Sequence, residues 1–133
     1  MAMTGLDKWY AYVKSHDAAQ LWDLIHPDAV FESPVVHTPQ RGRDLTFKYL
    51  VSALAVLNSS SFTYAGEWRN DNGAVLEFVT EIDGIKINGV DIITFNEAGQ
   101  IIHFKVMLRP LKAVNLVHRL MGEELMRQGG GPK

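Results

Sequence analysis

The chain has 133 residues, of which 47% are apolar and 21% are charged, and its formal net charge is −2. A chain of this length buries a core without staples, so we predict one domain over residues 1–128 and a flexible tail at 129–133. The near-neutral charge argues against nucleic acid as a partner, because phosphate binding needs a basic surface. The absence of cysteine excludes disulfides, thiolate catalysis and cysteine metal sites.

The hydropathy pattern indicates whether the chain contains a membrane-spanning helix or a secretory signal. No apolar stretch approaches the roughly 20 residues that a membrane-spanning helix needs. The first residues contain no basic segment followed by an apolar run, so no secretory signal is visible. We therefore expect a cytoplasmic protein without a membrane partner.

The N-terminal half predicts two helices, a short strand and a third helix. The first helix follows from apolar residues at helical spacing, namely Leu6, Trp9, Tyr10 and Val13. Asp17 is suited to cap a second helix, which we expect to end at His26-Pro27. Residues 29–33 predict a strand, and residues 34–42, with two prolines, predict a loop. The third helix follows the loop and extends to Leu57.

The C-terminal half predicts mainly strands. Residues 62–69 alternate apolar and polar side chains, as a strand does. Residues 73–109 predict a three-stranded antiparallel meander with turns at 83–84 and 96–99. Pro110 suits the first turn of a last helix. The fold class is therefore α+β, in which a strongly twisted antiparallel sheet with helices on one face encloses a hollow.

Alternation also assigns faces within residues 62–69. It places Glu67 and Arg69 on the face opposite Tyr64 and Trp68. We expect Glu67 and Arg69 to form a cross-strand ion pair there.

Asp91 is the unusual residue of the meander. Val90 and Ile92 flank it where a strand should be most buried. A buried carboxyl group costs free energy unless it is protonated, hydrogen-bonded or paired. Groups with perturbed pKa values cluster at functional sites, so we predict that Asp91 faces a pocket. Its role there is either catalytic or that of a structural carboxylate bonded to a turn or a neighbouring tyrosine.

The order of the predicted elements resembles the nuclear transport factor 2-like superfamily, which includes ketosteroid isomerases and SnoaL-like polyketide cyclases. The resemblance covers residues 6–109 and is strongest at Phe31-Glu-Ser-Pro, at Gln40-Arg-Gly-Arg and at 90–101. It implies a cone-shaped curved sheet with the N-terminal helices on its concave face and a mouth that admits a small apolar ligand. It also implies a homodimer formed through the outer face of the sheet.

The resemblance implies roles for single residues. A ketosteroid isomerase has its general-base aspartate just before the proline that follows the first strand, where this chain has Ser33. The tyrosine that donates to the oxyanion would come from the first helix, where Trp9 stands with Tyr10 and Tyr12 nearby. The family's protonated aspartate on the long strand matches Asp91. Because one of these three parts is present, we do not expect steroid isomerisation by the family mechanism.

The remaining candidates lie around the implied pocket. His37 is in the loop near the mouth, and opposite a carboxylate it would form an acid/base pair near neutral pH; the alternative is a surface histidine. The residues predicted to bind the ligand are also ordinary core residues by spacing, Ser33 excepted: Trp9, Tyr12, Phe31, Ser33, Phe78 and Phe104. No histidine has the spacing of a metal ligand, so we predict neither a metal nor another cofactor.

Two functions remain open at this point. The first is a small-molecule pocket protein that acts as a cofactor-independent isomerase or cyclase on an apolar carbonyl or ring compound through Asp91 with His37. The second is a non-catalytic ligand-binding or dimerisation module, which the missing base at Ser33 favours. Asp91 and His37 close together in space would favour the isomerase or cyclase. A cavity filled by the protein's own aromatic side chains would favour the non-catalytic module.

Overall fold

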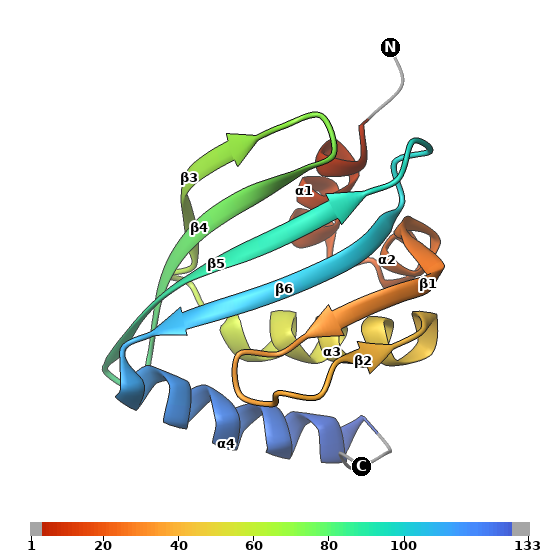
Figure 1. The fold of residues 1–133 in the computed structure, drawn as a ribbon. Coiled ribbons are helices and arrows are strands. Elements are labelled where there is room, and N and C mark those ends of the chain that lie inside the picture. Colours follow the sequence, from red (N-terminus) through yellow and green to blue (C-terminus); the bar gives the residue numbers. More distant parts are fainter. Residues whose placement is uncertain (1–3, 129–133) are drawn as a thin grey trace.

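The computed structural model describes residues 4–128, and the predicted tail at 129–133 lies outside the described residues. Figure 1 shows the helices and strands in chain order. They are α1 (Gly5–Ser15), α2 (Ala18–Leu24), β1 (Ile25–Glu32), β2 (Gln40–Arg41), α3 (Arg43–Leu57), β3 (Thr63–Arg69), β4 (Gly73–Ile82), β5 (Ile85–Phe95), β6 (Ile101–Arg109) and α4 (Leu111–Arg127). None of these helices is long and apolar enough to cross a membrane.

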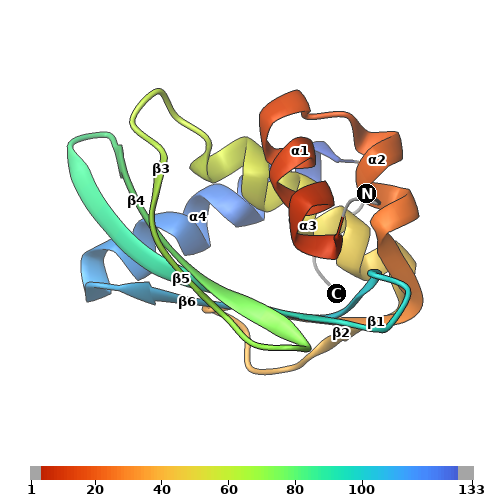
Figure 2. The same cartoon turned by 90° about the horizontal axis from the view of Figure 1, so that it is seen from above.

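The strands form one curved, unclosed sheet in the order β2-β1-β6-β5-β4-β3. The predicted meander is confirmed, because β3, β4, β5 and β6 pair as antiparallel neighbours. β1 differs from the expected antiparallel arrangement, since it pairs with β6 in parallel. A crossover that contains α3 joins these two strands, and parallel strands require such a connection. The helices lie on the concave side of the sheet (Figure 2).

The junction between α2 and β1 lies earlier than predicted. The helix ends at Leu24, and Ile25 already belongs to the strand, whose predicted start was residue 29. Proline removes a backbone donor and is tolerated where a strand is irregular. Pro27 lies in the part of β1 where the pairing with β6 shifts its register, which explains how the strand extends through it.

The predicted helix cap and the predicted hairpin turn are both present. Asp17 caps α2, because its side chain accepts a hydrogen bond from the backbone N–H of Ala19. Asp83 and Gly84 connect β4 to β5 with φ angles of 52° and 78°. Positive φ at both positions is what a two-residue hairpin turn of type I′ requires, and it matches the twist of the strands.

A β-bulge in β3 changes which side chains face the helices. Tyr64 pairs with Phe78 of β4, but Gly66, two residues further on, pairs with the very next partner, Glu77. An extra residue in one strand shifts the alternation of all that follow. Glu67 therefore lies on the same face as Tyr64, and the predicted assignment of these two residues to opposite faces is wrong.

The shifted face brings β3 into contact with α1. The hydroxyl of Tyr10 donates to Oε1 of Glu67 at 2.5 Å, and Nε of Arg69 lies 2.8 Å from Oε2 of the same carboxylate. Glu67 and Arg69 thus form an ion pair within one strand rather than across two. Trp68 is turned to the outer face, where 59% of its surface is exposed.

Candidate functional site

Asp91 lies on β5 and faces the helices, with only 6% of its surface exposed. It stands opposite Leu76 of β4 and Val106 of β6 in the register of the sheet. The hydroxyl of Tyr64 donates to Oδ2 of Asp91 at 2.8 Å, and Nε1 of Trp9 donates to the oxygen of Tyr64 at 3.1 Å. A chain of two hydrogen bonds therefore runs from α1 through β3 to the buried carboxyl group.

The contact between α1 and β3 holds this chain in place. The ring of Tyr10 meets the ring of Tyr64 edge-on, with 5.7 Å between centroids. The hydroxyl of Tyr10 is in turn held by Glu67. Because the bulge turns Glu67 toward α1, it indirectly fixes the position of Tyr64 beside Asp91.

Burial sets the protonation of the site. Desolvation raises the pKa of Asp91 from 3.8 to about 7, and the hydrogen bond from Tyr64 acts in the opposite direction. Desolvation and the nearby negative charge of Asp91 raise the pKa of Tyr64 well above its ordinary value. Tyr64 therefore stays a neutral donor, whereas Asp91 gains and loses a proton near neutral pH.

The cavity beside Asp91 measures about 30 Å³. Its buried walls are formed by Trp9, Leu50, Leu57, Phe78, Phe104 and Val106. A water molecule needs on the order of 10–15 Å³ of such space, so the cavity has room for about two or three waters. The protein's own aromatic rings fill most of the interior, which is the arrangement expected of a non-catalytic module.

The predicted wall residues separate into two groups. Trp9, Phe78 and Phe104 line the cavity with Asp91. Tyr12 and Phe31 are buried behind this wall: Tyr12 contacts the ring of Trp9 at 5.6 Å, and Phe31 stacks on Phe104 at 6.1 Å. These two rings support the wall and do not line the cavity.

His37 and Ser33 lie elsewhere. His37 is exposed and lines a separate pocket of about 340 Å³ that also includes Ser33, Glu32 and Lys105. Among residues 4–128 no hydrogen bond joins His37 to Asp91. The structure therefore brings Asp91 together with Tyr64 and Trp9 rather than with His37.

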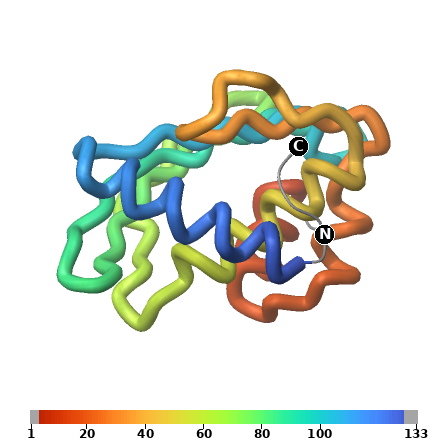
Figure 3. The backbone as a smooth tube through the Cα atoms, turned by 90° about the horizontal axis from the view of Figure 1, so that it is seen from below, coloured from red at the N-terminus to blue at the C-terminus, as the bar shows by residue number. Residues whose placement is uncertain are grey.

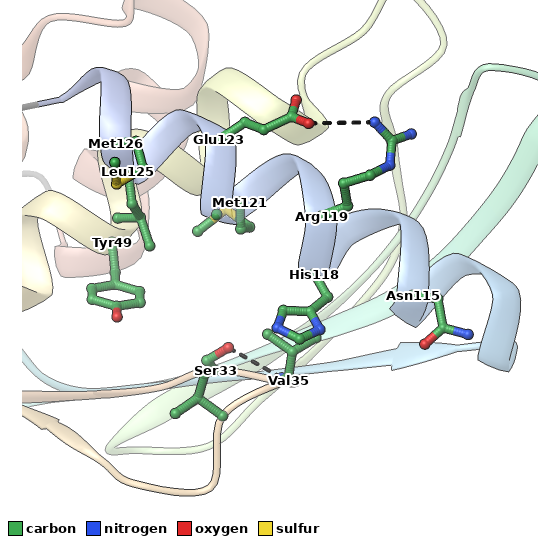
Figure 4. A pocket seen from close by; sticks show the side chains of 12 residues that line it. Ser33, Val35, Tyr49, Asn115, His118, Arg119, Met121, Glu123, Leu125 and Met126 are labelled. Atoms are coloured by element: carbon green, nitrogen blue, oxygen red, sulfur yellow. Dashed lines mark hydrogen bonds and ion pairs between the residues drawn. The ribbon is translucent and has the colours of Figure 1, made fainter. Parts of the chain in front are cut away.

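A larger pocket of about 460 Å³ lies beside α4 (Figure 4). Its walls come from α4, from the segment between β1 and β2, and from Tyr49 of α3. Figure 3 shows α4 and the segment between β1 and β2 facing each other. Ser33 lines this pocket also. The helical spacing predicted α4 but not a pocket against it, because its partner is a loop without periodicity.

A cluster of charged side chains lies where β1 meets β6. Nε2 of His103 lies 2.6 Å from Oε2 of Glu32, and Nζ of Lys105 lies 3.7 Å from the same oxygen. The hydrogen bond with His103 is the main reason that the pKa of Glu32 is lowered. Neighbouring strands place these groups side by side, and the cluster serves to pair β1 with β6. In the part of the chain that the structure describes, no three His, Asp or Glu side chains are grouped to hold a metal ion.

Comparisons with known proteins agree with this geometry. The SnoaL-like domain family matches residues 6–104, so the chain belongs to this family. The chain is 32% identical to a steroid Δ-isomerase from Pseudomonas aeruginosa, with 93% of this chain and 88% of that one covered and a TM-score of 0.80. The predicted superfamily and fold class are confirmed.

Two further solved structures share the fold. A protein with a cystatin-like fold from Silicibacter pomeroyi is 28% identical, with 92% and 85% of the two chains covered and a TM-score of 0.83. A nuclear transport factor 2-like protein from Mesorhizobium loti is 21% identical, with 80% and 88% covered and a TM-score of 0.67, which shows the fold alone. The comparison with curated proteins found no match.

Proposed function

We propose that this chain binds a small, largely apolar molecule between the concave sheet face and the helices, where Asp91 exchanges a proton with an oxygen-bearing group of that molecule. The reaction class is a cofactor-independent isomerisation or cyclisation of a carbonyl or ring compound. One observation carries the proposal: Asp91 is a buried carboxyl group beside a cavity, with a pKa of about 7. Such a group donates or accepts a proton at neutral pH without a cofactor.

The hydrogen bonds assign roles to the atoms of the site. Tyr64 donates to Oδ2 of Asp91, so we assign Oδ1 to the ligand. An ionised Asp91 would take a proton from the carbon next to a carbonyl group and then return it to another carbon of the same molecule, which leaves the carboxylate as it began. Between these two steps the protonated Asp91 would be able to donate a hydrogen bond to the enolate oxygen. The resemblance implies that Ser33 replaces the base of the ketosteroid isomerases, so a reaction here would have to use the single carboxyl group of Asp91, and the missing base itself favours the non-catalytic alternative.

The relatives support the ligand class. The relative from Pseudomonas aeruginosa bears the name of a steroid Δ-isomerase, and this favours an apolar, ring-bearing ligand for the present chain. The aromatic walls of the cavity, Trp9, Phe78 and Phe104, favour the same class. A role of His37 as the partner of Asp91 stays a prediction, because the two residues line different pockets.

A thermal-shift screen of apolar carbonyl and ring compounds at pH 7 tests the proposal. The screen compares the wild type with Asp91→Asn and His37→Gln. A ligand at 100 times its dissociation constant adds about 2.7 kcal/mol to the free energy of unfolding, which is an easily measured shift. We expect ligands of the wild type that lose their effect in Asp91→Asn. Ligands that stabilise both proteins equally would contradict the proposal, and an unchanged His37→Gln would remove His37 from it.

A non-catalytic binding module is the second candidate function. It is favoured by the small size of the cavity, which the protein's own rings fill to about 30 Å³. The two candidates differ in turnover: ligands found by the screen are converted to products in the first case and recovered unchanged in the second. The change in absorbance of a conjugated carbonyl compound during incubation with the protein distinguishes them.

We also propose that the chain forms a homodimer through the outer face of the sheet. Three apolar side chains stand exposed there, Trp68, Val79 and Met107, and exposed apolar groups that cluster on one face mark interaction sites. β3 and β4, which carry Trp68 and Val79, are neighbours in the sheet, and β5 alone separates them from β6, which carries Met107. A cytoplasmic location likewise stays a prediction.

Met107→Lys is expected to convert the dimer to a monomer. Met107 is 51% exposed, and a lysine there would bury a charge in the contact between two copies. Light scattering coupled to size-exclusion chromatography measures the mass. Met126→Lys is the matched control, because Met126 is also exposed, at 64%, but lies on α4. A wild-type protein that elutes as a monomer would rule out the dimer.

A further inference from the structure

The cavity beside Asp91 has a buried end and a partly exposed end. Asp91, Phe78 and Phe104 form the buried end. Ala53, Leu54 and Phe62 also line the cavity, but these three residues are only half-buried. The cavity therefore approaches the surface between the second half of α3 and the start of β3.

Phe62 lies at this exposed end. Its ring stacks on the ring of Phe78, with 5.3 Å between centroids and 23° between planes. It also meets the ring of Tyr64 edge-on at 5.2 Å. Phe62 thus contacts both the flat wall of the cavity and the residue that hydrogen-bonds to Asp91.

The backbone next to Phe62 is firmly held. Oγ of Ser59 lies 2.8 Å from Oγ1 of Thr80, and the backbone N–H of Glu81 donates to Oγ of Ser61 at 3.0 Å. These bonds fasten the segment between α3 and β3 to β4. A change in the side-chain conformation of Phe62 therefore does not require the segment to leave the sheet.

We propose that the ring of Phe62 controls access to the Asp91 pocket, and that this ring is displaced by a flat, ring-bearing ligand that stacks on Phe78. This inference rests on the proposed function and deepens it by naming the ligand class. A ligand ring in place of Phe62 keeps the stacking on Phe78 and brings an oxygen substituent toward Asp91. A saturated ring of the same size lacks the flat face and the quadrupole that aromatic stacking uses.

Isothermal titration calorimetry with 2-naphthol and its saturated analogue 2-decalol tests this inference. In the wild type the ring of Phe62 must move before the ligand binds, which lowers the observed affinity by the fraction of open protein. Phe62→Ala removes this requirement, so we expect 2-naphthol to bind it about 10-fold more tightly than the wild type. We expect 2-decalol to bind Phe62→Ala about 2- to 10-fold more weakly than 2-naphthol does.

Phe47→Ala is the matched control. Phe47 is a half-buried phenylalanine on α3 that meets the ring of Trp22 edge-on at 5.2 Å and does not line the cavity. We expect it to bind 2-naphthol as the wild type does. If Phe62→Ala does not fold, Phe62→Leu replaces it, because leucine keeps an apolar group but removes the ring. Equal affinities in the Phe62 variant and in Phe47→Ala would overturn the inference, and so would equal binding of the two ligands.

The double variant Phe62→Ala/Asp91→Asn separates this inference from the proposed function. If the double variant loses the affinity for 2-naphthol that Phe62→Ala gained, the result supports both the role of Phe62 and the proposed function of Asp91. If the gain persists there, Phe62 still controls access to the pocket, but Asp91 does not bind the ligand and the proposed function fails.

Discussion

Asp91→Asn is expected to stabilise the protein at pH 8 by about 2 to 4 kcal/mol. The folded-state pKa of Asp91 is raised from 3.8 to about 7, so the folded protein holds this proton more tightly than the unfolded chain. The resulting loss of stability is absent below pH 3.8, grows as the pH rises and is complete above about pH 7. Asparagine keeps the shape and an acceptor for Tyr64 but carries no charge to bury.

Urea unfolding at pH 5 and pH 8 measures this effect. The free energy of unfolding of the wild type should fall between these two pH values by about 2.7 kcal/mol more than that of Asp91→Asn, because the proton is lost over about two pH units of that range. Asp71→Asn is the control, because Asp71 is exposed in the turn before β4. A variant that is less stable than the wild type at both pH values would show that Asp91 is a structural carboxylate.

The expected gain in stability has a functional meaning. A carboxyl group that destabilises the fold at neutral pH is not explained by the packing of the core. Proteins keep such residues where activity needs them, and the variant that gains stability then loses function. The same substitution should therefore weaken ligand binding, and the two measurements together identify Asp91 as a functional residue.

Tyr64→Phe is expected to raise the pKa of Asp91 further above 7. The hydroxyl of Tyr64 donates to Oδ2 of Asp91, and this bond favours the ionised carboxylate. Hydrogen bonds to charged groups contribute about 1.5 to 3 kcal/mol, which corresponds to a rise of about one to two pH units. The proton of Asp91 would then be retained throughout the neutral range, and proton transfer from the ligand to Asp91 would slow.

The pH profile of the Asp91 ¹³C carboxyl resonance measures this rise. Tyr49→Phe is the matched control: Tyr49 is buried on α3, but it lines the pocket beside α4 and not the cavity of Asp91. An unchanged midpoint in Tyr64→Phe would mean that the bond between Tyr64 and Asp91 does not set the protonation of the site.

The sequence predicted a buried Asp91 because apolar residues flank it in the middle of a long strand, and β5 is regular there. Asp91 is paired with the buried Val106 of β6, and it lies two residues before the buried Ile93 on β5. The side chains of Asp91 and Ile93 therefore lie on the same, buried face of the sheet. Alternation failed in β3, since the bulge between Tyr64 and Gly66 adds one residue without a pattern in the sequence. The contact of Glu67 with Tyr10 followed from that bulge and was not predictable.

The size of the cavity could not be predicted from the sequence either. Periodicity identifies Trp9, Phe78 and Phe104 as inward-facing residues, but the space between them depends on how rings from α1, α3 and the sheet pack together. The same limit applies to His37, whose loop has no periodicity and which lies in another pocket. A neighbouring tyrosine was one of the predicted partners of Asp91, but the sequence does not identify it as Tyr64, because that pairing depends on how β3 packs beside the sheet.

The ¹³C NMR titration of the Asp91 carboxyl group in the complete wild-type chain is the most direct test of the proposed site. Assignment of the resonance comes from its absence in Asp91→Asn. A midpoint of about 7 is predicted, because the group is buried and has Tyr64 as its hydrogen-bond donor. A midpoint near the ordinary value of 3.8 would contradict the site, since the carboxylate would then be ionised at neutral pH with no proton to give.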